Sequence, residues 1–244
     1  MAARCSGYRE DRSSCVAIGW GALGSQVVTN LVRSGFGEWT LVDHDRTMPH
    51  NLARSAFLRE DVGCNKAQAM AVHLGRIVAD LPAEWTPRDV LGPASPLNMF
   101  GEALDKAGLV LDFSASAAVE RQLAPNVKCK ARRVTFFLSP TGRHIAMLAE
   151  DSDRSMTRFE LEGEFFRLLI RTRELCGFYG LGSRRFRYGR ACNDLPAVIP
   201  QHRVALHAAL ASSAVHALNA APRVAVWTLT RTWRSGATRP SAAP

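Results

Sequence analysis

The amino-acid sequence predicts an α/β protein, with a Rossmann-like, mainly parallel sheet, helices on both faces and a C-terminal helix-loop-helix-strand extension. Three observations lead to this fold class. A short apolar run at residues 15–18 stops at a glycine-rich stretch, helical spacing begins directly after it, and a second apolar run at 39–42 ends at Asp43. Strand, glycine turn, helix and strand in this order form a βαβ unit, whose crossover is right-handed.

Each strand and helix of this βαβ unit is predicted by its own stretch of sequence. Residues 15–18 are continuously apolar, which is typical of a parallel strand buried on both faces. The helix is expected over residues 23–34, where apolar side chains recur at helical spacing, and Gly35 ends it. The second strand, at 39–42, is again apolar and short.

The same criteria place the remaining elements. Apolar residues at helical spacing predict further helices at 66–79, 117–129, 159–175 and 203–218. Apolar runs predict further strands at 109–111, 134–138, 144–149 and 224–229. Two segments carry no predicted element: the proline-rich residues 82–96 and the Gly- and Arg-rich residues 176–201. We therefore predict a Rossmann-like domain over 1–150, an extension over 151–235 that completes the same unit, and a disordered tail at 236–244.

The composition argues against several classes of protein. No apolar run approaches the ~18 residues that span a bilayer, and the N-terminus lacks the apolar core of a signal peptide, so we expect a soluble, cytoplasmic protein. The net charge of +9 favours anionic partners, but no basic and aromatic stripe resembles a nucleic-acid module. The six cysteines form no C-x-x-C pair, so we expect no zinc site and reduced thiols.

A glycine motif lies between the first predicted strand and the first predicted helix. Its residues, at the spacing G-x-G-x-x-G, are Gly19, Gly21, Ala22, Leu23 and Gly24. Glycines allow the tight turn and let phosphate approach backbone N–H groups at a helix N-terminus. Asp43, at the end of the next strand, is placed to bind ribose hydroxyls. Alone, this pattern favours NAD or FAD.

Five further polar residues favour a triphosphate instead. They are Asp45, Asn51, Arg54, Lys66 and Asp112. The negative charges of a triphosphate need cations nearby, and a guanidinium binds phosphate through two hydrogen bonds. Asp112 ends a central strand and is placed to hold Mg²⁺ between phosphates. The set therefore predicts ATP and Mg²⁺ as the ligands.

The order of these motifs resembles the adenylation domain of the ThiF/MoeB/HesA family, relatives of ubiquitin-activating enzymes. The family pattern is a glycine loop, then D-x-D, N-L-x-R and G-x-x-K, then an aspartate that ends a later strand, and all five stand here within residues 15–120. The resemblance implies that Asp43 binds ribose while Asn51 and Arg54 contact phosphates. It also implies that Lys66 stabilises charge on the phosphates and that Asp112 binds Mg²⁺.

The reaction that this resemblance implies is adenylation of a protein. The C-terminal carboxylate of a ubiquitin-like or other protein attacks the α-phosphate of ATP, which gives an acyl-adenylate and pyrophosphate. Positioning of phosphates and neutralisation of their charge would supply the catalysis. Family members usually dimerise and often borrow an arginine from the partner, so we expect a homodimer, with Arg4, Arg9 and Arg12 as candidates for that arginine.

Two departures from the family pattern point to one branch. The paired C-x-x-C motifs of the sulfur-carrier branches are absent, and Asp112 stands in D-F-S-A-S rather than D-x-x-D-N. With the late segment 189–194 and a terminal strand containing Trp227, this variant resembles the activating domain of bacterial ubiquitin-like conjugation systems, which occur beside CBASS-type antiphage operons. That resemblance implies a separate conjugating protein as a further partner.

Cys192 is the cysteine we expect to be reactive. Four arginines of the same predicted loop would stabilise its thiolate: Arg184, Arg185, Arg187 and Arg190. Its role would be to accept the activated carboxyl group as a thioester. We expect Cys129 and Cys176 to pack in helices instead, and Cys64 to stand near a helix start.

Three other functions remain open from the sequence. One is an enzyme of the same fold without a thioester step, such as the dehydratase that cyclises threonylcarbamoyladenosine in tRNA. A second is an inactive partner subunit of an activating-enzyme heterodimer, which the presence of Arg54, Lys66 and Asp112 argues against. The third is a dehydrogenase, which the set Asn51, Arg54 and Lys66 argues against.

Overall fold

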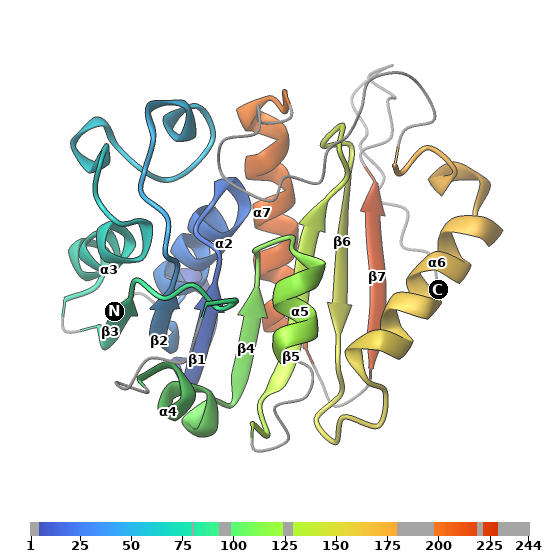
Figure 1. The fold of residues 1–244 in the computed structure, drawn as a ribbon, viewed down its shortest axis with the longest axis horizontal. Helices are drawn as coiled ribbons and strands as arrows, with labels where there is room; N and C mark the ends of the chain where they lie inside the picture. Colours follow the sequence, from blue (N-terminus) through green and yellow to red (C-terminus); the bar gives the residue numbers. More distant parts are fainter. Residues whose placement is uncertain are drawn as a thin grey trace.

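A single seven-stranded sheet runs through the computed structural model, which describes residues 5–79, 81–92, 99–123, 129–179, 198–218 and 222–228. The strand order is β3-β2-β1-β4-β5-β6-β7 (Figure 1). The strands are β1 (Asp11–Ile18), β2 (Phe36–Val42), β3 (Ala83–Thr86), β4 (Leu109–Asp112), β5 (Arg132–Leu138), β6 (His144–Ala149) and β7 (Arg223–Thr228). The pairs among β1 to β5 are all parallel, whereas β6 is antiparallel to both β5 and β7. The predicted fold class is confirmed.

Helices cover both faces of this sheet. One face carries α2 (Ala22–Arg33), α3 (Lys66–Ile77) and α7 (Gln201–His216). The other carries α4 (Met99–Lys106), α5 (Ala117–Leu123) and α6 (Arg158–Arg171), which lie toward the viewer in Figure 1. Side chains alternate between the two faces of the sheet along β1. Ala17 packs in the apolar cluster under α2, α3 and α7, and the neighbouring Val16 packs in the cluster under α4 and α5.

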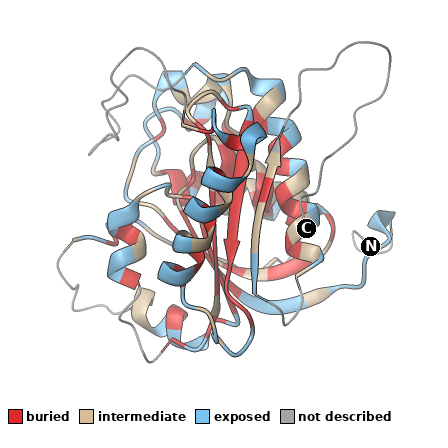
Figure 2. Cartoon of the chain, turned by 90° about the vertical axis from the view of Figure 1, so that its right-hand side faces the viewer, coloured by how far each residue is buried: buried red, intermediate tan, exposed pale blue. Residues whose placement is uncertain are grey.

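Burial follows this arrangement. Buried residues gather along the central strands and on the inner sides of the helices, while the outer sides of the helices are exposed (Figure 2). Within the described ranges, no helix combines the length and the apolar character that crossing a membrane requires.

Several element boundaries differ from the sequence prediction. The first strand begins at Asp11, because its polar first half is held by pairing with β2 and by a bond from the Asp11 N–H to the carbonyl of Gly35 at 3.0 Å. Strand β3 forms within the proline-rich segment, where pairing with β2 replaces the missing apolar signal. Helix α4 was not predicted either.

Two predicted helices are shorter than expected. The helix predicted at 117–129 ends its described part at Leu123, and Cys129 is buried but not helical. Helix α6 ends at Arg171, because Thr172 takes an extended conformation, and a 3₁₀ turn, Arg173–Leu175, follows it. Cys176 comes directly after this turn and is exposed, so the prediction that it packs in a helix is wrong.

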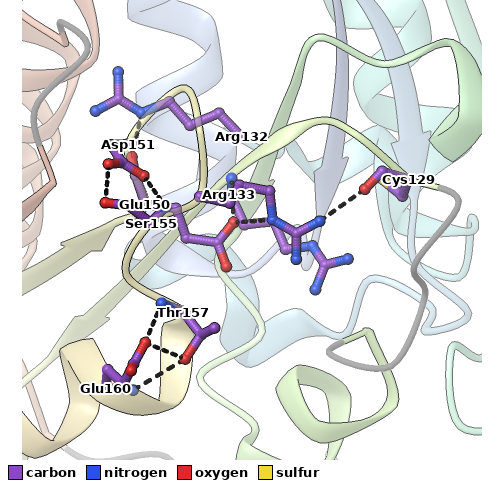
Figure 3. A network of polar contacts seen from close by, with 9 residues as sticks. Cys129, Arg132, Arg133, Glu150, Asp151, Ser155, Thr157 and Glu160 are labelled. Carbon is purple, nitrogen blue, oxygen red and sulfur yellow. Dashed lines mark hydrogen bonds and ion pairs between the residues drawn. The ribbon is translucent and has the colours of Figure 1, made fainter.

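A polar network orders the connection from β6 to α6, at the amino-terminal edge of the parallel strands (Figure 3). Arg154 donates to the buried Glu150 at 3.1 Å and to the carbonyl of Cys129 at 2.9 Å. The Asp151 carboxylate accepts from the Ser155 N–H at 2.7 Å, and a Thr157–Glu160 capping box starts α6. This network lies at the opposite edge of the sheet from the glycine motif, so we assign it a structural role.

Candidate active site

The glycine motif forms a tight turn at the carboxyl end of β1. Gly19 has φ +89°, a conformation that residues with a side chain rarely adopt. A Cβ atom on Gly19 would lie 2.7 Å from the backbone nitrogen of Ser114, so the turn lies against the segment that follows β4. The carboxyl ends of β1 and β4 thus meet at this point, because Ile18 and Asp112 are register partners.

Helix α2 begins in this turn, and no side chain of the described residues caps its first N–H groups. Its N-cap residue, Gly21, makes no side-chain capping bond, and the first turn holds no acidic residue. A Cβ atom on Gly21 would meet no atom of the described residues within 4 Å, so the space beside this glycine is open. Uncapped N–H groups and the positive end of the helix dipole suit an anion such as phosphate.

Asp43 closes the glycine loop from the end of β2. Its Oδ2 accepts a hydrogen bond from the Trp20 N–H at 2.7 Å, and its Oδ1 accepts one from the Asp45 N–H at 2.8 Å. Burial raises the pKa of the Asp43 carboxyl, while the nearby charge of Lys66 lowers it. Each carboxylate oxygen retains acceptor capacity, so the predicted bond to ribose hydroxyls is compatible with this geometry.

Lys66 and Asp45 form an ion pair beside the loop. The Lys66 Nζ lies 2.9 Å from the Asp45 Oδ2, and the two side chains are 8% and 21% exposed. Asn65 places Lys66, since its Nδ2 donates to the carbonyls of Asp43 and Asp45 at 3.0 and 3.1 Å while its Oδ1 caps α3. The structure therefore brings the predicted Lys66 next to both carboxylates of the D-x-D motif.

Three consecutive residues after β2 carry side chains of the kind that bind metal cations. Among the described residues, Asp43, His44 and Asp45 offer ligand atoms within 4.8 Å of one another. The ammonium of Lys66 already lies against Asp45, which disfavours a second cation at that carboxylate.

The loop that carries Asn51 and Arg54 is a 3₁₀ turn, Pro49–Ala53. The Asn51 Oδ1 accepts from the Met48 N–H at 2.8 Å, and the Asn51 carbonyl accepts from the Arg54 N–H at 3.2 Å. Asn51 therefore shapes the turn and places the arginine after it. Arg54 is half-buried, and this burial lowers the pKa of its guanidinium.

Two residues of α2 that the sequence analysis did not select hold this loop. The Gln26 side chain donates to the Arg54 carbonyl at 2.6 Å, and the Ser25 Oγ accepts from the Ala56 N–H at 3.0 Å. The sequence signal was weak: two polar residues on a helix that is otherwise apolar on its inner face.

Asp112 ends β4 beside the glycine loop, as predicted. Its Oδ1 accepts from the Ser114 N–H at 2.8 Å, whereas its Oδ2 is buried and has no hydrogen-bond partner among the described residues. Burial raises the pKa of the Asp112 carboxyl to about 6. A buried carboxylate with an unused oxygen is costly unless a cation binds it, and Mg²⁺ prefers oxygen ligands.

A partly buried ion pair that the sequence analysis missed lies near Asp112. The Arg158 Nη2 is 2.6 Å from the Glu120 Oε1, and the Arg158 Nε donates at 3.2 Å to the Oγ1 of Thr135, the register partner of Asp112. The two charges affect the Asp112 pKa in opposite directions. Their positions in α5 and α6 are far apart in the sequence, so no motif could have paired them.

Other predicted residues lie elsewhere or outside the described ranges. Cys192 and its four neighbouring arginines fall within residues 180–197, which the structure does not describe. Arg4 also lies outside the described residues, and Arg12 pairs with Glu10 at 2.9 Å near the start of β1, the opposite end of the strand from the glycine loop. Their roles remain predictions, as do the homodimer and the domain boundaries.

Comparisons with known proteins bear on the family and the fold of the chain. The profile of the ThiF family matches residues 8–142. The ATP-dependent ubiquitin transferase-like protein Cap2 of Enterobacter hormaechei subsp. hoffmannii is 42% identical over 66 residues, which make up 27% of this chain and 11% of the relative. Ubiquitin-like modifier-activating enzyme 5 of Drosophila simulans is 28% identical over 139 residues, 54% of this chain and 34% of the relative.

Solved structures show the same fold at low sequence identity. E. coli MccB with ATP has a TM-score of 0.59 at 13% identity, over 99% of this chain and 66% of MccB. Selenomethionine PaaA has a TM-score of 0.58 at 16% identity, over 94% of this chain and 64% of PaaA. The chain spans less than two thirds of the length of each of these relatives. The family profile nevertheless covers more than half of the sequence, and the chain belongs to the ThiF family.

Proposed function

We propose that this chain binds Mg-ATP at the carboxyl edge of its sheet and adenylates the C-terminal carboxylate of a protein or peptide. The observation that carries the proposal is the buried Asp112 carboxylate, whose Oδ2 has no hydrogen-bond partner among the described residues, next to the uncapped start of α2. A phosphate at the helix terminus and a cation at the carboxylate satisfy both features at once. NAD would leave the carboxylate without a cation.

In the proposed reaction each of these residues has a different role. The first N–H groups of α2 would bind phosphate oxygens, while Arg54 and Lys66 would offset negative charge that grows on them. Asp112 would hold Mg²⁺, which when bound neutralises phosphate charge and favours attack at the α-phosphorus. The substrate carboxylate oxygen forms a bond to that phosphorus, the bond to the bridging oxygen breaks, and pyrophosphate leaves.

The relatives support this assignment. MccB has been solved with ATP, and also with the analogue AMPCPP and MccA. The name of Cap2 describes an ATP-dependent protein that is ubiquitin transferase-like. We therefore propose a ubiquitin-like protein or a peptide as the acceptor of the adenylate, and a role in antiphage defence for the system to which the chain belongs.

Titration with ATP and with NAD in separate calorimetric experiments tests the ligand. We expect binding of ATP in the presence of Mg²⁺ and none of NAD. Arg54→Ala should slow ATP–pyrophosphate exchange by about 100-fold or more, the loss expected for one charge-stabilising group in a partly buried site. Arg59→Ala, which removes an exposed arginine from the same loop region, is the matched control. Binding of NAD without binding of ATP would refute the assignment.

A second step, thioester formation at Cys192, is also proposed and rests on the sequence. With ATP and a candidate carrier protein, we expect a covalent adduct that an added thiol such as dithiothreitol releases by thioester exchange and that Cys192→Ala lacks, while pyrophosphate exchange persists. An adduct that survives this substitution would exclude Cys192 and direct attention to Cys64 or Cys176, both of which are exposed.

A further inference from the structure

A side-chain amide of α2 makes one of the contacts between this helix and the Arg54 loop, residues 54–57. Gln26 lies in the second turn of α2, and its Nε2 donates to the Arg54 carbonyl at 2.6 Å. The same nitrogen lies 3.2 Å from the carbonyl of Ala22, in the first turn of the helix. An amide nitrogen carries two hydrogens, so it can bond both carbonyls and join the loop to the start of α2.

Ser25 supports this contact at the neighbouring position. Its Oγ donates to the Gly21 carbonyl at 2.8 Å and accepts from the Ala56 N–H at 3.0 Å. The carbonyl of Arg54 and the N–H of Ala56 are therefore both held by consecutive residues of α2. Two such bonds fix the place and the orientation of the backbone that carries the Arg54 side chain.

Gln26 also contacts the C-terminal part of the chain. Its Nε2 lies 3.3 Å from the Oε1 of Gln201, the first residue of α7. Helix α7 packs along α2, and the Ser212 Oγ donates to the Val27 carbonyl at 3.3 Å. One side chain thus lies where the glycine-loop helix, the Arg54 loop and the start of α7 meet.

We propose that Gln26 is a positioning residue, which sets the place of Arg54 relative to the uncapped start of α2. The inference rests on the proposed function, since it assigns Arg54 to the phosphates. Arg54 follows a short 3₁₀ turn, so no helix or strand fixes its place. Its backbone is held by hydrogen bonds instead, and the bond from Gln26, at 2.6 Å, is shorter than the 3.2 Å bond from the Arg54 N–H to the Asn51 carbonyl.

The expected loss of exchange activity depends on how far Arg54 would move without the Gln26 bond. A displacement of about 1 Å in a positioning contact can cost about 100-fold in rate. Gln26→Leu keeps the approximate volume and removes the donor, so we expect ATP–pyrophosphate exchange to fall by about 10- to 100-fold. Gln68→Leu, an exposed glutamine on α3, controls for the added apolar side chain and should leave exchange unchanged.

A double-mutant cycle with Arg54→Ala tests whether Gln26 acts through Arg54. If it does, Gln26→Leu lowers exchange in the wild-type background and has little further effect once Arg54 is alanine. A purely structural defect would lower exchange by the same factor in both backgrounds, and this result would overturn the inference. Full exchange activity in Gln26→Leu would also overturn it.

Hydrogen–deuterium exchange of the nucleotide-free protein provides a readout that does not depend on activity. The amides of the Arg54 loop, residues 54–57, should exchange faster in Gln26→Leu than in wild type and Gln68→Leu. If wild-type protein shows no exchange activity with ATP, the proposed function fails, and the hydrogen-exchange result alone decides whether Gln26 holds the loop. Unchanged amide exchange in Gln26→Leu would then refute the inference.

Discussion

Asparagine in place of Asp112 is expected to lower ATP–pyrophosphate exchange by about 100- to 1,000-fold and, at the same time, to stabilise the nucleotide-free protein. The two effects have one cause. The Asp112 Oδ2 is buried without a hydrogen-bond partner among the described residues, and burial raises the pKa of the carboxyl to about 6. At pH 8 the carboxyl is therefore ionised, and its charge is costly until a cation binds.

Asparagine retains the acceptor for the Ser114 N–H and removes the charge. Because one unit of pKa displacement corresponds to about 1.4 kcal/mol, we expect the free energy of unfolding at pH 8 to rise by roughly 1–3 kcal/mol. Thermal unfolding with and without Mg-ATP measures both effects. Mg-ATP should raise the Tm of the wild type and have a much smaller effect on the variant, since a ligand stabilises only the state that binds it.

The exposed Asp105 of α4 provides the control, because Asp105→Asn makes the same chemical change away from the site. This control should leave the exchange rate, and the Tm with and without Mg-ATP, close to those of the wild type. An Asp112→Asn variant that keeps wild-type exchange would remove Asp112 from the proposed mechanism. A loss of stability in the same variant would instead show that the carboxylate has a structural partner.

The sequence was sufficient to predict how Asp112 and the glycine loop come together. Both follow parallel strands directly, and the carboxyl ends of neighbouring parallel strands lie at the same edge of a sheet. Gly19 and Asp112 therefore had to lie close to each other once β1 and β4 were predicted to belong to one sheet. The same reasoning placed Asp43 beside the loop, at the end of β2.

Other contacts could not be predicted, since they depend on how separate elements pack. Lys66 was expected to stabilise phosphate charge, but no motif indicated that Asp45 would lie 2.9 Å from its Nζ. Strand β3 has no apolar run, and it exists because β2 offers an unpaired edge to a short extended segment. The Gln26 contact depends on the path of the Arg54 loop, which has no periodic pattern to reveal it.

Alanine in place of Gly24 is expected to destabilise the protein by about 3 kcal/mol, as overpacking of a closely packed site does. Alanine would ordinarily strengthen a helix by up to about 1 kcal/mol relative to glycine. Here the added Cβ would fall on the carbonyl oxygen of Gly19 and lie 3.0 Å from the Cβ of Phe113. The backbone oxygen cannot rotate away as a side chain can, so the steric cost exceeds the gain in helix propensity.

Gly21→Ala is the matched control. It distinguishes a loss of stability through overpacking from a loss of ATP binding through a blocked approach of phosphate. Gly21 has an extended backbone that any residue can adopt, and its Cβ would meet nothing within 4 Å. The Tm of Gly21→Ala should stay close to that of the wild type, whereas the Tm of Gly24→Ala should fall by roughly 6–12 °C for a chain of this length. Because a Cβ on Gly21 would extend into the space where phosphate is proposed to bind, Gly21→Ala should weaken ATP binding in calorimetry while the protein remains folded. If Gly24→Ala melts at the wild-type temperature, the turn can relax around a side chain, and close packing is not the reason for this glycine.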